Sequence, residues 1–238
     1  MFLRREGVLR RNAGPCRIVG PSCIGGFQEN LPVKIVIAPD KFKEALSARD
    51  VCEAIQRGIQ SVLPDAEIEA VPMADGGEGT VDALVAATGG AFRRTWVTDP
   101  VGRPVEAEWG LLGDGRTAAL EMAAASGLAL VTPDRRDPTQ TTTYGTGELI
   151  RAALEAGVAR ILIGIGGSAT TDGGAGAAQA VGVQFLNMYR APLSRPLRGG
   201  DLFEIGGISL SRRDPRVADT TIEVACDVDN PLLGPRGA

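Results

Sequence analysis

The sequence has 238 residues, of which 44% are hydrophobic, 4% aromatic and 23% charged, and its formal net charge is −4. A chain of this length and hydrophobicity can bury a substantial core, while its negative charge argues against general nucleic-acid binding. It contains no histidine, which excludes Ser-His-Asp and Cys-His catalysis and histidine metal sites. We therefore expect a small-molecule ligand and, if the protein is an enzyme, a carboxylate as general base.

Four scattered cysteines without a C-x-x-C pair favour reduced cytosolic thiols over a zinc site or a disulfide framework. The sequence has no apolar run approaching the roughly 20 residues that span a bilayer, so we expect a cytoplasmic protein with no membrane partner. Residues 1–32 are rich in arginine, glycine and proline. We interpret them as a disordered or non-native N-terminal extension, with a targeting peptide as the alternative.

Two strand-loop-helix units are predicted after the extension. Lys34–Ala38 is a short apolar run typical of a covered strand. A helix begins after Ser47, a plausible N-cap, and ends before Pro64. A second strand is expected at Glu67–Pro72, and the loop that follows it leads into a helix that continues to about residue 88.

The pattern changes to shorter β-like runs between residues 91 and 131. These runs are Thr95–Val97, Val105–Leu111 and Thr117–Met122. They predict a meandering, partly antiparallel insertion or second domain.

Alternating helix and strand return after residue 139, which favours a doubly wound sheet. We expect a helix from about Gly145 to Ala156, a strand at Arg160–Gly164 and an alanine-rich helix after a glycine-rich loop. Residues 187–216 are predicted to be a surface loop with weak helix, followed by a short strand at Glu223–Cys226.

The glycine-rich loop after the strand at 160–164 is the strongest candidate for ligand binding. Backbone N–H groups and the positive end of a helix dipole can bind phosphate oxygens at such a loop. The loop is not a Walker A motif. A dinucleotide site is a weak alternative, because the loop departs from G-x-G-x-x-G. The other alternative is a tight turn that binds no ligand. The candidates are Gly166, Gly167, Ser168, Thr170, Thr171, Asp172, Gly173 and Gly174.

Two further turns rich in acidic residues, glycine or lysine follow predicted strands. One suits Mg²⁺ binding or proton abstraction from a hydroxyl, with a capped helix start as the alternative; it contains Asp75, Gly76, Gly77, Glu78, Gly79 and Thr80. The other could neutralise phosphoryl or carboxylate charge, or be an ordinary charged loop; it contains Asp40, Lys41 and Lys43. Because open α/β sheets bind ligands outside the carboxyl ends of their strands, we expect the three turns to meet around one pocket.

Two other segments leave their interpretation open. Asp227 and Asp229 follow the last predicted strand, where metal binding and an Asx-turn are equal alternatives. The segment Thr143–Glu148 suits a helix capping box, or a set of hydroxyl and amide donors for a ligand.

Six of these segments, in order, resemble the signature segments of the glycerate kinase family. They are APDKFKEALSA, PMADGGEGT, VTDPVGRPV, YGTGELI, IGIGGSATTDGGAG and ACDVDNPLLGPRGA. The resemblance covers roughly residues 33–238. It implies a flavodoxin-like doubly wound parallel sheet with an inserted second α/β domain. It also implies a cleft that binds ATP, Mg²⁺ and D-glycerate, with 2-phosphoglycerate as product.

On this resemblance, residues 33–90 form the N-terminal part of the flavodoxin-like domain and residues 91–238 the second domain. Phosphoryl transfer depends on positioning and charge neutralisation, so we expect Asp172 or Asp75 to orient or deprotonate the attacking hydroxyl, and Lys43 to offset charge. The family continues beyond the last segment matched here, so we expect a C-terminally truncated chain. An inactive fragment is one alternative and an NAD(P)-binding oxidoreductase is a more distant one; the sequence leaves the oligomeric state open.

Overall fold

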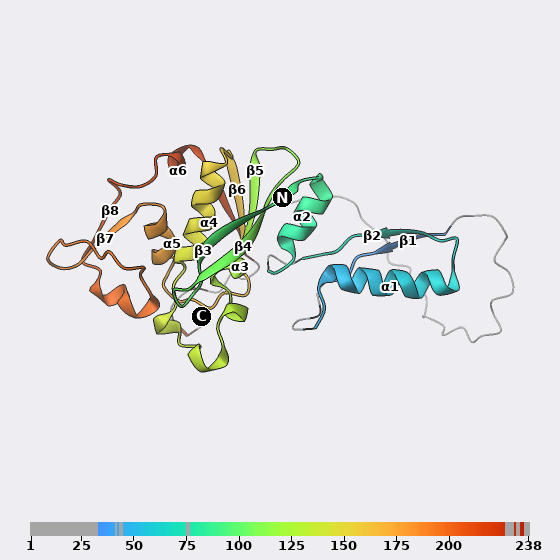
Figure 1. Cartoon of the computed structure of the whole chain (residues 1–238), viewed down its shortest axis with the longest axis horizontal. Coiled ribbons are helices and arrows are strands. Elements are labelled where there is room, and N and C mark those ends of the chain that lie inside the picture. The colour runs from blue at the N-terminus through green and yellow to red at the C-terminus, as the bar shows by residue number, and fades with distance from the viewer. Residues whose placement is uncertain are drawn as a thin grey trace.

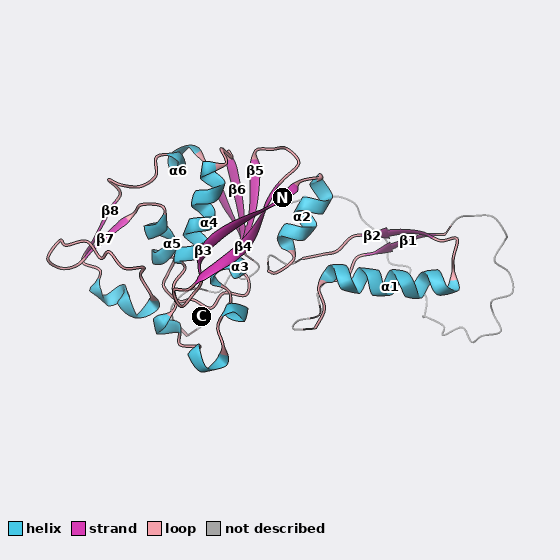
Figure 2. Ribbon diagram, viewed as in Figure 1, coloured by secondary structure: helices cyan, strands magenta, loops and turns pink. Residues whose placement is uncertain are grey.

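The computed structural model describes residues 33–40, 42, 45–74, 77–226, 231 and 234–235. Within them, strands and helices form a two-stranded unit, a five-stranded sheet with covering helices and a small two-stranded sheet (Figures 1 and 2). The predicted α/β fold class is confirmed. None of the helices in these residues is both long enough and apolar enough to cross a bilayer.

The first unit consists of β1 (Lys34–Ile37), α1 (Ala48–Val62) and β2 (Glu67–Ala70). The two strands pair in parallel, and Figure 1 shows the unit set apart from the larger sheet. Ser47 is the N-cap of α1, as predicted, and its Oγ accepts a hydrogen bond from the backbone N–H of Asp50 at 3.1 Å. The order of these elements is as predicted, but β2 ends at Ala70 rather than Pro72, and β1 is not the covered strand expected, because Val36 is 58% exposed.

The larger sheet has the strand order β3-β4-β5-β6-β9. β3, β4 and β5 pair antiparallel, whereas β5, β6 and β9 are parallel. The antiparallel meander expected after residue 90 is confirmed, and it belongs to the same sheet as the later parallel strands. The strand bounds are Ala91–Thr98, Pro104–Leu111, Thr117–Glu121, Arg160–Gly164 and Thr221–Ala225.

Helices cover both faces of this sheet because side chains alternate along its central strands. α2 (Thr80–Thr88) packs Val81 and Val85 against Ala119 of β5 on one face. Neighbouring residues of β5 point to the other face and pack with α4 (Tyr144–Glu155). The short helices α3, α5 and α6 span Met122–Ser126, Ala175–Ala180 and Arg216–Asp219.

The packing of α2 bears on the domain organisation. The division at residue 90 assigns α2 to the first domain, yet its buried side chains join the core of the five-stranded sheet. The location of the domain boundary stays a prediction, and the packing of α2 favours one before residue 80.

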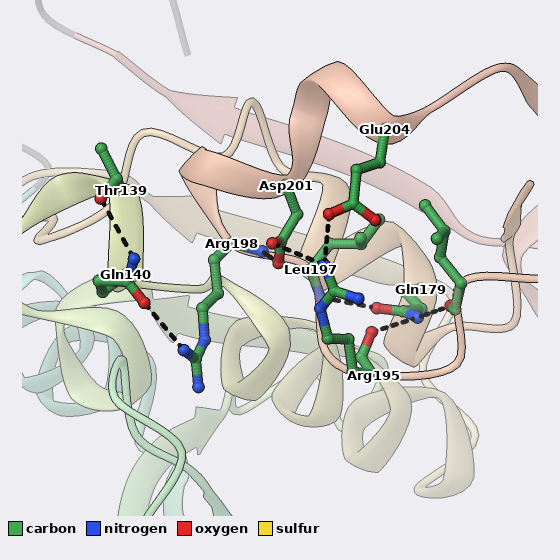
Figure 3. Close-up of polar contacts among 9 residues, drawn as sticks. Thr139, Gln140, Gln179, Arg195, Leu197, Arg198, Asp201 and Glu204 are labelled. Atoms are coloured by element: carbon green, nitrogen blue, oxygen red, sulfur yellow. Dashed lines mark hydrogen bonds and ion pairs between the residues drawn. The ribbon is translucent and has the colours of Figure 1, made fainter. Parts of the chain in front are cut away.

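Residues 187–216, expected to be a surface loop with weak helix, contain β8 (Gly207–Ser209) and the 3₁₀-helix η5 (Gly199–Glu204). β8 pairs antiparallel with β7 (Gln184–Leu186), a strand that was not predicted. Figure 3 shows the polar contacts that hold this segment: Arg195 pairs with Asp201 and Glu204 at 2.9 and 2.8 Å, and Arg198 donates to Gln140 at 3.1 Å. Three-residue strands are too short to show a sequence periodicity, which explains why they were missed. The remaining 3₁₀-helices are η2 (Leu128–Leu130), η3 (Pro133–Arg135) and η4 (Pro138–Gln140).

The core beneath α4 provides a test of the packing. Leu149 is completely buried in it, so we expect Leu149→Ala to lower the free energy of unfolding by about 2–5 kcal/mol through lost burial and a residual cavity. Urea denaturation measures the change. Leu210→Ala, at a residue that is 59% exposed, is the matched control, and an equal loss in the two variants would contradict the assigned core.

Candidate functional site

The loop between β6 and α5, residues 165–174, is held in place by a buried carboxylate. Asp172 is only 1% exposed. Its Oδ2 accepts hydrogen bonds from the backbone N–H and the Oγ1 of Thr143, both at 2.8 Å, and from the N–H of Gly176 at 3.1 Å. Its Oδ1 accepts one from the N–H of Gly174 at 3.0 Å. Asp172 thus joins the residue before α4 to the start of α5, and both of its oxygens are engaged within the protein.

The turn into α5 requires glycine. Gly173 and Gly174 have φ angles of 60° and 78°, in the left-handed region that residues with a Cβ rarely adopt. α5 itself has six residues, fewer than two turns. The expectation that a helix dipole supplies much of the anion binding here is therefore weakened, and side chains gain in importance.

Hydroxyl groups fix one side of the loop. The side chains of Thr141, Thr142 and Thr143 are buried beside it. Thr141 donates from Oγ1 to the carbonyl of Ala169 at 2.8 Å, and Thr171 donates to the carbonyl of Pro138 at 3.1 Å. The segment before α4 is therefore bonded to the loop by hydroxyls as well as by Asp172.

Backbone hydrogen bonds fix the other side of the loop. The N–H of Leu128 donates to the carbonyl of Gly167, and the N–H of Ala169 donates to the carbonyl of Ser126, both at 2.9 Å. These bonds bring the segment after α3 against the loop, so the loop lies between two segments distant in sequence.

The turn that precedes α2 lies beside the same loop. A Cβ placed on Gly167 would lie 4.0 Å from Oε1 of Glu78. The hydroxyl of Thr80 donates to the carbonyl of Gly77 at 2.7 Å, which closes the turn. The structure thus brings the described part of the segment 75–80 together with the glycine-rich loop.

Glu121, at the carboxyl end of β5, accepts a hydrogen bond from the N–H of Val81 at 2.9 Å. Burial raises the pKa of the Glu121 carboxyl, and the charge of Asp82 raises it further, although bonds from backbone N–H groups at the start of α2 oppose the shift. Glu121 is a carboxylate at the site that the sequence analysis did not select. Its position depends on a contact across 40 residues, which no local pattern shows.

The segments that follow β1 and β2 are joined by a backbone hydrogen bond. The N–H of Met73 donates to the carbonyl of Pro39 at 2.9 Å, and the neighbouring Asp40 is exposed. Lys41, Lys43, Asp75, Gly76, Asp227 and Asp229 lie outside the described residues. The convergence of all three turns on one pocket therefore stays a prediction. Among the residues that are described, no cluster of three or more acidic, cysteine or histidine side chains could hold a metal ion.

A cavity of about 220 Å³ opens beside the loop. Its lining combines hydroxyl groups of the loop with one cationic and one anionic side chain from the segment before α4. The arginine and the aspartate were not selected from the sequence, because neither lies in a glycine-rich turn. The lining residues are Leu128, Val131, Arg136, Asp137, Pro138, Thr141, Ser168, Ala169, Thr170 and Thr171.

Comparison with known proteins identifies the family. The model of the glycerate kinase family matches residues 35–238. The chain belongs to the glycerate kinase family. It is 55% identical over 206 residues to glycerate 2-kinase of Escherichia coli K12 and 56% identical over 206 residues to glycerate kinase of Bacillus subtilis 168.

These matches cover 87% of the chain but 54% and 53% of the two relatives. A crystal structure assigned to glycerate kinase 2 of Salmonella typhimurium LT2 superposes with a TM-score of 0.75 at 52% identity, covering 87% of this chain and 55% of the other. The chain thus spans about half the length of the glycerate kinases that it matches.

The hydrogen bonds of Asp172 predict a stability effect. Asp172→Ala removes the acceptor of four donors at a buried site, so we expect the free energy of unfolding to fall by about 3–5 kcal/mol. Asp172→Asn, which keeps one acceptor oxygen, should lose less. Urea denaturation compares both with Asp65→Ala, at an exposed turn residue; a loss no greater than that of this control would contradict the assignment.

The pKa of Glu121 predicts a pH dependence. A carboxyl whose pKa is higher in the folded than in the unfolded state destabilises the fold once ionised, so its effect is absent below the unfolded-state pKa of about 4.3 and grows as the pH rises through the folded-state pKa. We therefore expect Glu121→Gln to gain stability relative to the parent chain as the pH rises from about 4 to about 7.

Urea denaturation across this pH range measures the gain. Glu155→Gln, at an exposed position of α4, is the control for a general charge effect. A loss of stability of Glu121→Gln relative to the parent chain as the pH rises would show instead that the ionised carboxylate is favoured in the fold.

Proposed function

We propose that the chain supplies the site of an ATP-dependent kinase that phosphorylates D-glycerate to 2-phosphoglycerate with Mg²⁺. The proposal extends to a cytoplasmic enzyme whose partners are small molecules. Family membership supports the reaction class, and the identity to glycerate kinases supports the acceptor.

The observation that carries the proposal is the fixed loop of residues 165–174. Enzymes that transfer phosphoryl groups act chiefly by positioning the reactants and stabilising charge. The loop presents Ser168 and Thr170 at a cavity, and it is held on one side by Asp172 and on the other by the backbone of Ser126 and Leu128. A rigid, hydroxyl-bearing loop at the carboxyl end of a parallel strand suits this task.

The contacts of Asp172 define its proposed role. Both of its oxygens already accept hydrogen bonds from the protein, so we propose that Asp172 acts as a positioning residue that holds the loop. Deprotonation of the attacking hydroxyl then falls to Glu78 or Asp75. A charge-neutralising role for Lys43 remains part of the proposal.

A magnesium ion at this site would be bound mainly through the substrate. Mg²⁺ is usually held by one or two carboxylates together with substrate phosphates and water. Glu78 lies beside the loop. Whichever of Glu78 and Asp75 does not act as the base would provide one such ligand. The ion would neutralise charge on the transferred phosphoryl group.

Activity of the purified chain tests the proposal. We expect ADP release that depends on both glycerate and Mg²⁺, and a coupled assay that separates 2-phosphoglycerate from 3-phosphoglycerate should show the former. Glu78→Gln should lower kcat by about a hundredfold or more, which is the usual contribution of general acid-base catalysis. Glu155→Gln is the matched control. A folded chain that releases no ADP in response to glycerate would overturn the proposal.

A further inference from the structure

The cavity beside the loop combines one arginine with hydroxyl donors, and its size and charge suit a small organic acid. We propose that Arg136 binds the carboxylate of the hydroxy acid here, with Ser168 and Thr170 beside it. This inference rests on the proposed function and deepens it, because it assigns the recognition of the acceptor's carboxylate to named residues.

Arg136 is held in place yet keeps donors available. Its Nε donates to the carbonyl of Val131 at 3.2 Å, which fixes one edge of the guanidinium. Within the described part of the chain, no ion pair joins Arg136 to a carboxylate, whereas Arg103 in the neighbouring segment pairs with Asp99 at 2.8 Å. A guanidinium has five N–H donors in a planar fork that matches a carboxylate. The remaining N–H groups of Arg136 can therefore bind a ligand.

The hydroxyls of the lining divide into two pairs. Thr141 and Thr171 donate to backbone carbonyls, so their protons are committed within the protein. Ser168 Oγ and Thr170 Oγ1 lie 2.9 Å apart, and either can be the donor. One proton of this second pair thus remains for an acceptor such as a carboxylate or hydroxyl oxygen of the ligand.

Size and charge favour a small acid over a nucleotide at this position. Pockets for drug-sized ligands measure about 300–1,000 Å³, so a cavity of about 220 Å³ suits a smaller molecule. Asp137 also lines the cavity. Hydrogen bonds from the side chain and backbone of Thr139 lower the pKa of the Asp137 carboxyl, so it is ionised near neutral pH and repels a polyphosphate more strongly than a monocarboxylate.

Binding measurements on the chain test the assignment. We expect Arg136→Ala to weaken glycerate binding, measured by isothermal titration calorimetry, by about tenfold to a hundredfold, as for loss of a charged hydrogen bond. Arg136→Lys keeps the charge but not the planar fork of donors, so its affinity for glycerate should lie between those of the parent chain and Arg136→Ala. Affinity for ATP should stay within about twofold of the parent value in both variants.

Arg135→Ala is the matched control, because this neighbouring arginine is exposed, as Arg136 is, but is absent from the cavity lining. The amide of glyceric acid is a second probe: the parent chain should prefer glycerate to the amide, and Arg136→Ala should lose this preference. Circular dichroism establishes whether each variant is folded. If Arg136→Ala does not fold, the glycerate affinity of Arg136→Lys tests the assignment. Unchanged glycerate affinity in the folded variant, or equal weakening of glycerate and ATP, would overturn the assignment of Arg136. A parent chain that binds neither glycerate nor ATP would instead overturn the proposed function.

Discussion

The carboxylate of Asp172 is the constraint on which the site depends. It accepts hydrogen bonds from the residue before α4 and from the first residues of α5, so one side chain sets the positions of two helix starts relative to the loop. Ala177 adds to this link by donating its N–H to the hydroxyl of Thr143 at 2.9 Å. A buried acceptor with several donors is costly to disturb, and the loop it fixes forms part of the wall of the cavity.

The sheet explains why these segments meet. β5 and β6 run parallel, and Glu121 is paired with Gly164 where both strands end. The segments that leave the two strands consequently begin at the same edge. Glu121 bonds to the start of α2, while the loop after Gly164 bonds to the segment after α3. The site is thus a consequence of strand direction, as is usual for ligand sites in parallel sheets.

The sequence predicts much of the fold because its main elements have local signals. The apolar run at Arg160–Gly164 matches β6 in both bounds, and α1 begins after the predicted cap, Ser47. Local signals fail where an element is short. Met122 was assigned to a strand but begins α3, and β7 and β8, with three residues each, are set by pairing with each other.

The site was predictable only in part, for a related reason. Glycine-rich turns are visible in the sequence, so the loop containing Asp172 was found, and the structure then shows that its carboxylate bonds to Thr143, 29 residues away. Glu121 and Arg136 carry no comparable signal. Glu121 bonds to Val81, 40 residues away in the sequence. Arg136 lines the cavity together with residues 168–171, which are also distant in the sequence.

The shape of the loop also bears on how the two substrates would be distinguished. A long helix attracts any anion at its N-terminus, but α5 has only six residues, so recognition has to come from individual side chains. Arg136 and Asp137 are adjacent and line the same cavity with opposite charge. Such a pair leaves little net positive field for a polyphosphate, yet a guanidinium can still match a single carboxylate geometrically. If the proposed assignment of Arg136 holds, the cavity would select the acid, and ATP would bind elsewhere along the edge of the sheet, where the turn of Glu78 lies beside Gly167.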